Sequence, residues 1–149
     1  MKRNAKRFVA VFAAIIMVAG ILPVNLGGLT VAKAATEIKL NATDLSEGNI
    51  SANKEVNGFT LTAGSTVDAN TKTLESGIEV TRRLKLNGAG SFTSRSIVFK
   101  TTDAAKVSAY FMSSGDSVRS LALYKDDGTL ISEQPAKVGG TILEEQTYE

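Results

Sequence analysis

The segment from residue 78 to residue 86 reads IEVTRRLKL and alternates between apolar and polar side chains. Alternation with a period of two is typical of a β-strand with one face in the core and one in solvent. The first face holds Arg82 among four apolar residues, which are Ile78, Val80, Leu84 and Leu86. The second face is polar and holds Glu79, Thr81, Arg83 and Lys85. The pattern therefore predicts a half-buried strand with a charged outer face.

Shorter alternating runs lie on both sides of this strand. They cover residues 37–40, 59–63, 97–99, 107–111 and 121–123, and Leu130 marks a further strand. Turn-forming residues separate the runs at residues 87–90, 113–117 and 126–128, where Asp-Asp-Gly is typical of a hairpin. We expect residues 44–55 to form a loop. No long stretch beyond residue 35 has helical apolar spacing, so we expect an all-β, antiparallel β-sandwich of the jelly-roll kind over residues 35–149.

The first 34 residues have the layout of a secretory signal peptide. A basic start precedes an apolar run over residues 8–22, and residues 32–34 read Ala-Lys-Ala, which is a cleavage motif. We expect the run to be helical and cleavage to follow Ala34. The alternative is a membrane anchor, but a spanning helix needs roughly 18 or more apolar residues, and this run has 15. The sequence therefore predicts a secreted protein whose mature chain is residues 35–149.

Charge is divided unevenly between the leader and the mature chain. Residues 1–34 hold five of the 17 basic residues and none of the 15 acidic ones, so residues 35–149 hold 12 basic and 15 acidic residues and a net charge of −3. The formal charge of +2 is thus due to the leader. The mature chain gives no bulk-charge argument for nucleic acid or a membrane surface as partner. The absence of Cys and His excludes thiol and imidazole catalysis.

Residues 80–131 carry a series of short motifs in a fixed order. The motif residues are Arg83, Lys85, Gly88 and Gly90, then Ser94, Arg95, Ser96, Ile97 and Phe99, then Met112, Ser113 and Ser114, and then Arg119, Leu121, Leu123, Tyr124, Asp126 and Gly128. The series resembles the β-sandwich modules attached to secreted bacterial pectate lyases and related pectin-degrading enzymes. The resemblance covers residues 36–134. The main departures are Asn87, where the family has glycine, and the interruption of the serine-rich loop by Gly115 and Asp116.

The resemblance implies a non-catalytic carbohydrate-binding module that holds acidic plant polysaccharide, such as pectin or homogalacturonan, and targets an associated polysaccharide lyase. We expect no catalytic residue and no cofactor. We also expect no metal site, since residues 126–128 lack the ligand spacing of a calcium loop. Modules of this family continue into further strands, so we expect the last strands to be lacking after residues 146–149, where a strand begins. A longer parent protein would then carry a covalently linked lyase domain.

Two other hypotheses are open. The chain could be the N-terminal fragment of a pectate lyase whose catalytic domain is missing. It could also be a cell-surface structural or adhesion module without sugar affinity. Both classes are compatible with a secreted β-domain that lacks His and Cys.

Four basic residues inside the motifs are the candidate ligand-binding residues: Lys85, Arg83, Arg95 and Arg119. Guanidinium groups bind carboxylates through paired hydrogen bonds, and ammonium groups bind them as point charges. Arg83 and Lys85 lie on one strand face, roughly 7 Å apart. The alternatives are a solvated face with Glu79 as ion-pair partner, and rim positions for Arg95 and Arg119 that pack their stems against the core.

Aromatic residues are scarce, and the chain has no Trp. We expect Tyr110, Phe111 and Tyr124 to lie in the core. The sequence therefore favours a charge-based site over a platform on which a neutral sugar could stack.

Overall fold

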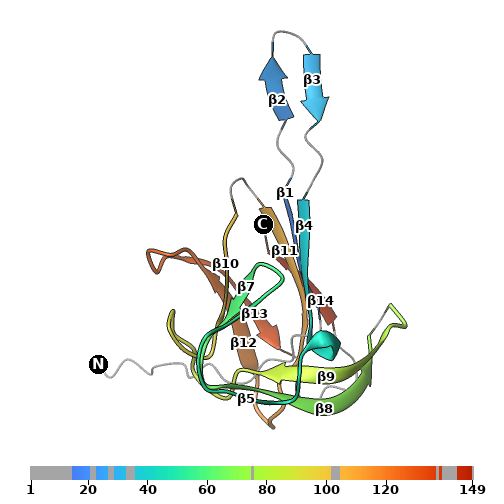
Figure 1. Ribbon diagram of the computed structural model, residues 1–149, viewed down its shortest axis with the longest axis vertical. Coiled ribbons are helices and arrows are strands. Elements are labelled where there is room, and N and C mark those ends of the chain that lie inside the picture. The colour runs from blue at the N-terminus through green and yellow to red at the C-terminus, as the bar shows by residue number, and fades with distance from the viewer. Residues whose placement is uncertain are drawn as a thin grey trace.

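The computed structural model describes residues 15–20, 23–26, 29–32, 36–74, 76–101, 105–136, 138 and 144–148. In these residues the chain forms small antiparallel sheets and one 3-10 turn, with no α-helix (Figure 1). Within the same ranges no helix has the length and apolar character needed to cross a membrane. The all-β class predicted from the sequence is confirmed.

The largest sheet has four strands in the order β14-β11-β1-β4. Its strands are β1 (Ile15–Gly20), β4 (Thr36–Asn41), β11 (Ala105–Phe111) and β14 (Glu144–Tyr148). β1 lies between β4 and β11 and is antiparallel to both, with Val18 opposite Ile38 on one side and Val107 on the other. A hairpin of β2 (Pro23–Leu26) and β3 (Leu29–Ala32) projects from this sheet (Figure 1).

The helix expected over residues 8–22 is wrong for Ile15–Gly20, which form β1. β-branched residues favour strands, and a short apolar run looks the same in sequence whether it becomes a helix or a central strand. Residues 8–14, 21 and 22, and the expected cleavage point after Ala34, lie outside the described residues. Signal-peptide cleavage stays a prediction.

Three smaller sheets complete the domain. One has the order β5-β8-β9, formed by β5 (Gly48–Ile50), β8 (Ser65–Thr73) and β9 (Glu79–Lys85). Another has the order β10-β7-β6, formed by β10 (Ile97–Phe99), β7 (Phe59–Leu61) and β6 (Lys54–Val56). The third is the hairpin of β12 (Arg119–Tyr124) and β13 (Leu130–Ala136), which confirms the turn predicted at residues 126–128.

One hydrophobic cluster joins these sheets. Phe59 of β7 and Leu84 of β9 are fully buried, and they share the cluster with Leu40 of β4 and Phe111 of β11. The ring of Phe59 meets that of Phe99 edge to face, with the centroids 5.7 Å apart. Burying each such side chain contributes about 1.5–3 kcal/mol to stability. The core therefore holds together sheets that would not be stable alone.

The strands predicted from alternation are largely confirmed, with three differences. Ile78 lies just before β9, and half of its surface is exposed, so it does not belong to the core face. Residues 44–55 contain β5 and β6 rather than one loop, after a 3-10 turn (η1) over Ala42–Asp44. β8 was not predicted, because Val67 is its only strongly apolar residue. Pairing with β5 and β9 makes β8 a strand, although its own sequence pattern does not predict one.

Candidate functional site

The register between β8 and β9 gathers charged side chains on one sheet face. Leu84 is fully buried and pairs with Val67 of β8. Successive residues of a strand point to opposite faces, so Arg83 and Lys85 lie on the face away from the core. Asp68 stands opposite Arg83 in the ladder and shares that face.

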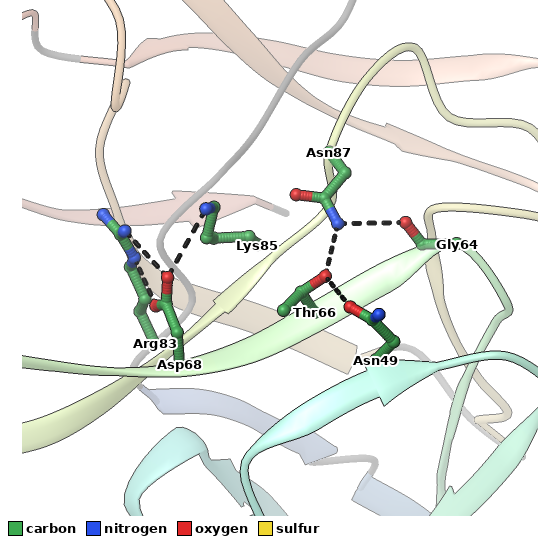
Figure 2. Close-up of polar contacts among 7 residues, drawn as sticks. All are labelled: Asn49, Gly64, Thr66, Asp68, Arg83, Lys85 and Asn87. Atoms are coloured by element: carbon green, nitrogen blue, oxygen red, sulfur yellow. Dashed lines mark hydrogen bonds and ion pairs between the residues drawn. The ribbon is translucent and has the colours of Figure 1, made fainter.

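Arg83, Lys85 and Asp68 form a charged cluster (Figure 2). Arg83 donates to the carboxylate twice, from Nε to Oδ1 at 2.6 Å and from Nη2 to Oδ2 at 2.9 Å. Lys85 Nζ lies 3.4 Å from Oδ2. The Arg83 hydrogen bonds hold the pKa of Asp68 below its ordinary 3.8, against a smaller opposing effect of desolvation. Two cations thus share one carboxylate, so the cluster has a net charge of one positive unit.

The two cations are not equally available to a ligand. Arg83 presents its fork to Asp68 in the bidentate geometry that guanidinium groups prefer. Lys85 has three donors, and its contact with the carboxylate is the longest of the cluster. Lys85 is therefore the cation of the cluster that can reach outward, and Arg83 fixes the carboxylate beneath it.

A chain of amide and hydroxyl groups continues the same face (Figure 2). Asn87 donates from Nδ2 to Gly64 O at 3.1 Å and to Thr66 Oγ1 at 2.7 Å, and Thr66 donates to Asn49 Oδ1 at 2.9 Å. Asn87 has a left-handed backbone with φ of 56°, which Asn adopts more readily than most residues. Asn87 can therefore replace the glycine of the family pattern, and it adds an amide to the surface.

Arg95 lies beside this chain on a strained backbone. Its φ is 56°, and its N–H donates to Ala63 O at 2.9 Å. Its side chain runs over two glycines: a Cβ at Gly64 would lie 3.1 Å from Arg95 Cγ, and a Cβ at Gly88 would lie 3.0 Å from Nη1. In the described part of the chain its guanidinium has no hydrogen bond or ion pair. Residues held in sparsely populated backbone regions cluster at functional sites, and the exposed guanidinium of Arg95 is accessible to a ligand.

Arg82 points to the opposite face of β9 and has a structural role. Its Nη1 donates to the carbonyl oxygens of Thr43 and Leu45, both at 2.8 Å. Its Nε lies 3.3 Å from Glu47 Oε1. These contacts attach β9 to η1, so the guanidinium has little capacity left for a ligand.

Arg119 lies apart from the other candidates, at the start of β12. A Cβ at Gly115 would lie 3.2 Å from its Nη2, and its Nε is buried without a hydrogen-bond partner among the described residues. Among the described residues, no hydrogen bond or ion pair joins it to the charged cluster. We therefore leave Arg119 out of the candidate site.

The structure joins two of the four predicted residues and adds others. Arg83 and Lys85 share one carboxylate, and Arg95 lies over Gly64 and Gly88, the first of which accepts a hydrogen bond from Asn87. The ion-pair partner is Asp68 and not Glu79, the alternative considered from the sequence. Asp68, Thr66 and Asn49 were missed because β5 and β8 were not recognised as strands. The signal in β8 was the polar alternation of Thr66 and Asp68 around Val67.

The aromatic residues divide between core and surface. Phe111 is buried as expected, but Tyr124 is exposed and its position in the core was wrongly predicted. Hydrogen bonds from the side chain of Thr129 and from its N–H, the latter at 2.8 Å, lower the pKa of Asp127 and cap the hairpin turn. In the described ranges no group of three Asp, Glu, His or Cys side chains is arranged to hold a metal ion.

Comparisons with protein-family models, with curated proteins and with solved structures found no match to this chain. The resemblance to pectate-lyase-associated modules therefore rests on the sequence motifs alone.

Proposed function

We propose that this chain is a secreted, non-catalytic module that binds acidic plant polysaccharide of the pectin or homogalacturonan type. Its fold is proposed to be a jelly-roll-like β-sandwich, an assignment supported by the single core shared by the small antiparallel sheets. The basic start, apolar run and Ala-Lys-Ala motif of residues 1–34 support secretion, and cleavage after Ala34 would remove β1 from between β4 and β11. In a longer parent protein the module would hold a lyase near its substrate and raise the effective substrate concentration.

The observation that carries the proposal is a pair of incompletely used cations: Lys85, whose one ion-pair contact is 3.4 Å long, and Arg95, whose side chain runs over Gly64 and Gly88. Galacturonan is a chain of sugar rings that each carry a carboxylate and hydroxyl groups. Lys85 has donors left for one carboxylate, and Arg95 offers an unpaired fork for another. Both Nδ2 hydrogens of Asn87 are used within the protein, so its Oδ1 is the atom that can accept from a sugar hydroxyl. The face therefore matches an anionic, hydroxyl-rich polymer better than a neutral one.

Affinity electrophoresis of the full chain in gels that contain polygalacturonate tests this function. We expect retardation that weakens as salt is added, since exposed charge pairs are screened. Lys85→Ala and Arg95→Ala should each reduce the retardation. Lys54→Ala is the matched control, because Lys54 is an exposed lysine on β6, in another sheet. A folded wild-type chain that migrates as it does in a gel without polysaccharide would contradict the proposal.

A further inference from the structure

Two aromatic rings meet on the surface near the candidate site. The side chain of Phe92 is 54% exposed and that of Tyr124 is 40% exposed. Their rings are edge to face, with centroids 6.2 Å apart and an interplanar angle of 82°. Phe92 belongs to the turn after β9 and Tyr124 ends β12, so this contact joins segments distant in sequence. Exposed aromatic groups held in this way are typical of binding sites.

The surroundings of the pair enlarge its apolar surface. Tyr124 stands opposite Leu130 in the β12–β13 ladder, and Leu130 is 48% exposed. Gly128 lies beside the ring of Phe92, where a Cβ would be 3.6 Å from Cε2. We call Phe92, Tyr124 and Leu130 the aromatic patch. All three of its residues are exposed.

The turn that carries Phe92 also carries hydroxyl groups and the free arginine. Ser91 N–H donates to Ser94 O at 2.8 Å, and Ser94 N–H donates back to Ser91 O at 3.4 Å. The hydroxyls of the two serines are 3.1 Å apart. The ends of such a four-residue turn lie within about 7 Å. Arg95 follows this turn directly in the chain, and its side chain runs over Gly64 and Gly88.

We propose that the aromatic patch is a stacking subsite for a galacturonate ring whose carboxylate is held by Arg95. This inference rests on the proposed function and extends it from charge alone to ring recognition. A hexopyranose ring has a face of C–H groups that suits the electron-rich face of an aromatic ring. The unpaired guanidinium of Arg95, which is three residues from Phe92 in the chain, favours an acidic sugar over a neutral one. An apolar protein partner would offer no anionic group to that guanidinium.

Calorimetric titration of the full chain with galacturonate oligomers tests the subsite. Phe92→Ala and Tyr124→Ala should each lower the association constant about three- to tenfold. They should leave its salt dependence unchanged, because neither removes a charge. Ile78→Ala is the matched control, since Ile78 is 50% exposed and lies in the β8–β9 connection. It should bind as the wild type does.

The outcomes separate the subsite from the function. Salt-sensitive binding by the wild type together with unchanged binding by Phe92→Ala and Tyr124→Ala would overturn the subsite and leave the function standing. No binding by the folded wild type would overturn both. The chain has three Tyr and no Trp, so tyrosine fluorescence gives a second readout. A ligand-induced change that persists in Tyr110→Phe and disappears in Tyr124→Phe, with affinity retained, would place the sugar at Tyr124.

Discussion

The charged cluster on β8 and β9 and the turn that ends at Arg95 use arginine in opposite ways. Arg83 is partly buried and paired with Asp68 through two hydrogen bonds. Arg95 is exposed, has a left-handed backbone and has no side-chain partner in the described residues. The difference indicates that the paired arginine organises the face and the unpaired arginine is available to a ligand.

The largest effect is expected from Gly90→Ala. A Cβ at Gly90 would lie 2.7 Å from the carbonyl oxygen of Arg95, so the turn must move. We expect the free energy of unfolding to fall by about 3 kcal/mol, as for other overpacked sites, and binding to weaken. Urea unfolding measures the change. Gly77→Ala is the control, since Gly77 has open space around it and a φ of 82°; its backbone strain alone should cost about 1 kcal/mol. Equal losses would contradict the steric role.

Arg82→Ala separates structure from binding on the same strand. The substitution leaves the carbonyl oxygens of Thr43 and Leu45 without their donor. We expect a loss of about 2 kcal/mol in the free energy of unfolding. Polygalacturonate affinity should be unchanged under conditions where the variant is folded. Weaker binding by the folded variant would show that the two faces of β9 are not separate in function.

The charged cluster should give stability a dependence on acid pH. The pKa of Asp68 is lowered in the folded state by its Arg83 hydrogen bonds, so its stabilising effect is present above the unfolded pKa of about 3.9. The effect is lost as pH falls through the lowered folded pKa. Asp68→Asn should therefore be less stable than wild type by about 1 kcal/mol at neutral pH, and the gap should close in acid.

Arg83→Ala provides the matching half of this experiment. In an Arg83→Ala protein, Asp68→Asn should change the pH dependence of the free energy of unfolding much less, because the main cause of the lowered Asp68 pKa is absent. Chemical unfolding at several pH values measures the four proteins. A stability gap between wild type and Asp68→Asn that stays constant into strong acid would contradict the ion-pair account.

The smallest effect concerns the strain at Arg95. Arg95→Gly should be more stable than Arg95→Ala by about 0.5 kcal/mol. Glycine removes a left-handed penalty of about 1 kcal/mol, which is partly offset by its greater freedom in the unfolded chain. Thermal unfolding of the two variants gives the difference, and both should bind polygalacturonate equally weakly. A less stable Arg95→Gly would show that the backbone is not strained.

Alternation allowed β9 and its charged face to be predicted, because Val80 and Leu84 mark the buried side unambiguously. The partner of that face could not be predicted, since β8 has one strongly apolar residue and is a strand through its pairing with β5 and β9. The contrast between Arg83 and Arg95 also depends on contacts across the chain, which spacing alone does not reveal. Tyr124 shows the same limit: it was expected in the core, but it ends its strand at the surface.

The most direct test of the account is the salt dependence of polygalacturonate affinity in the wild type and in Lys85→Ala/Arg95→Ala. We predict that the wild-type association constant falls steeply as salt rises, and that the double variant binds weakly with a shallow dependence, because two ligand-facing charges are missing. The double variant should remain folded, since Arg83 and Asp68 are kept. A double variant that is folded and binds with the affinity and salt dependence of the wild type would contradict the account.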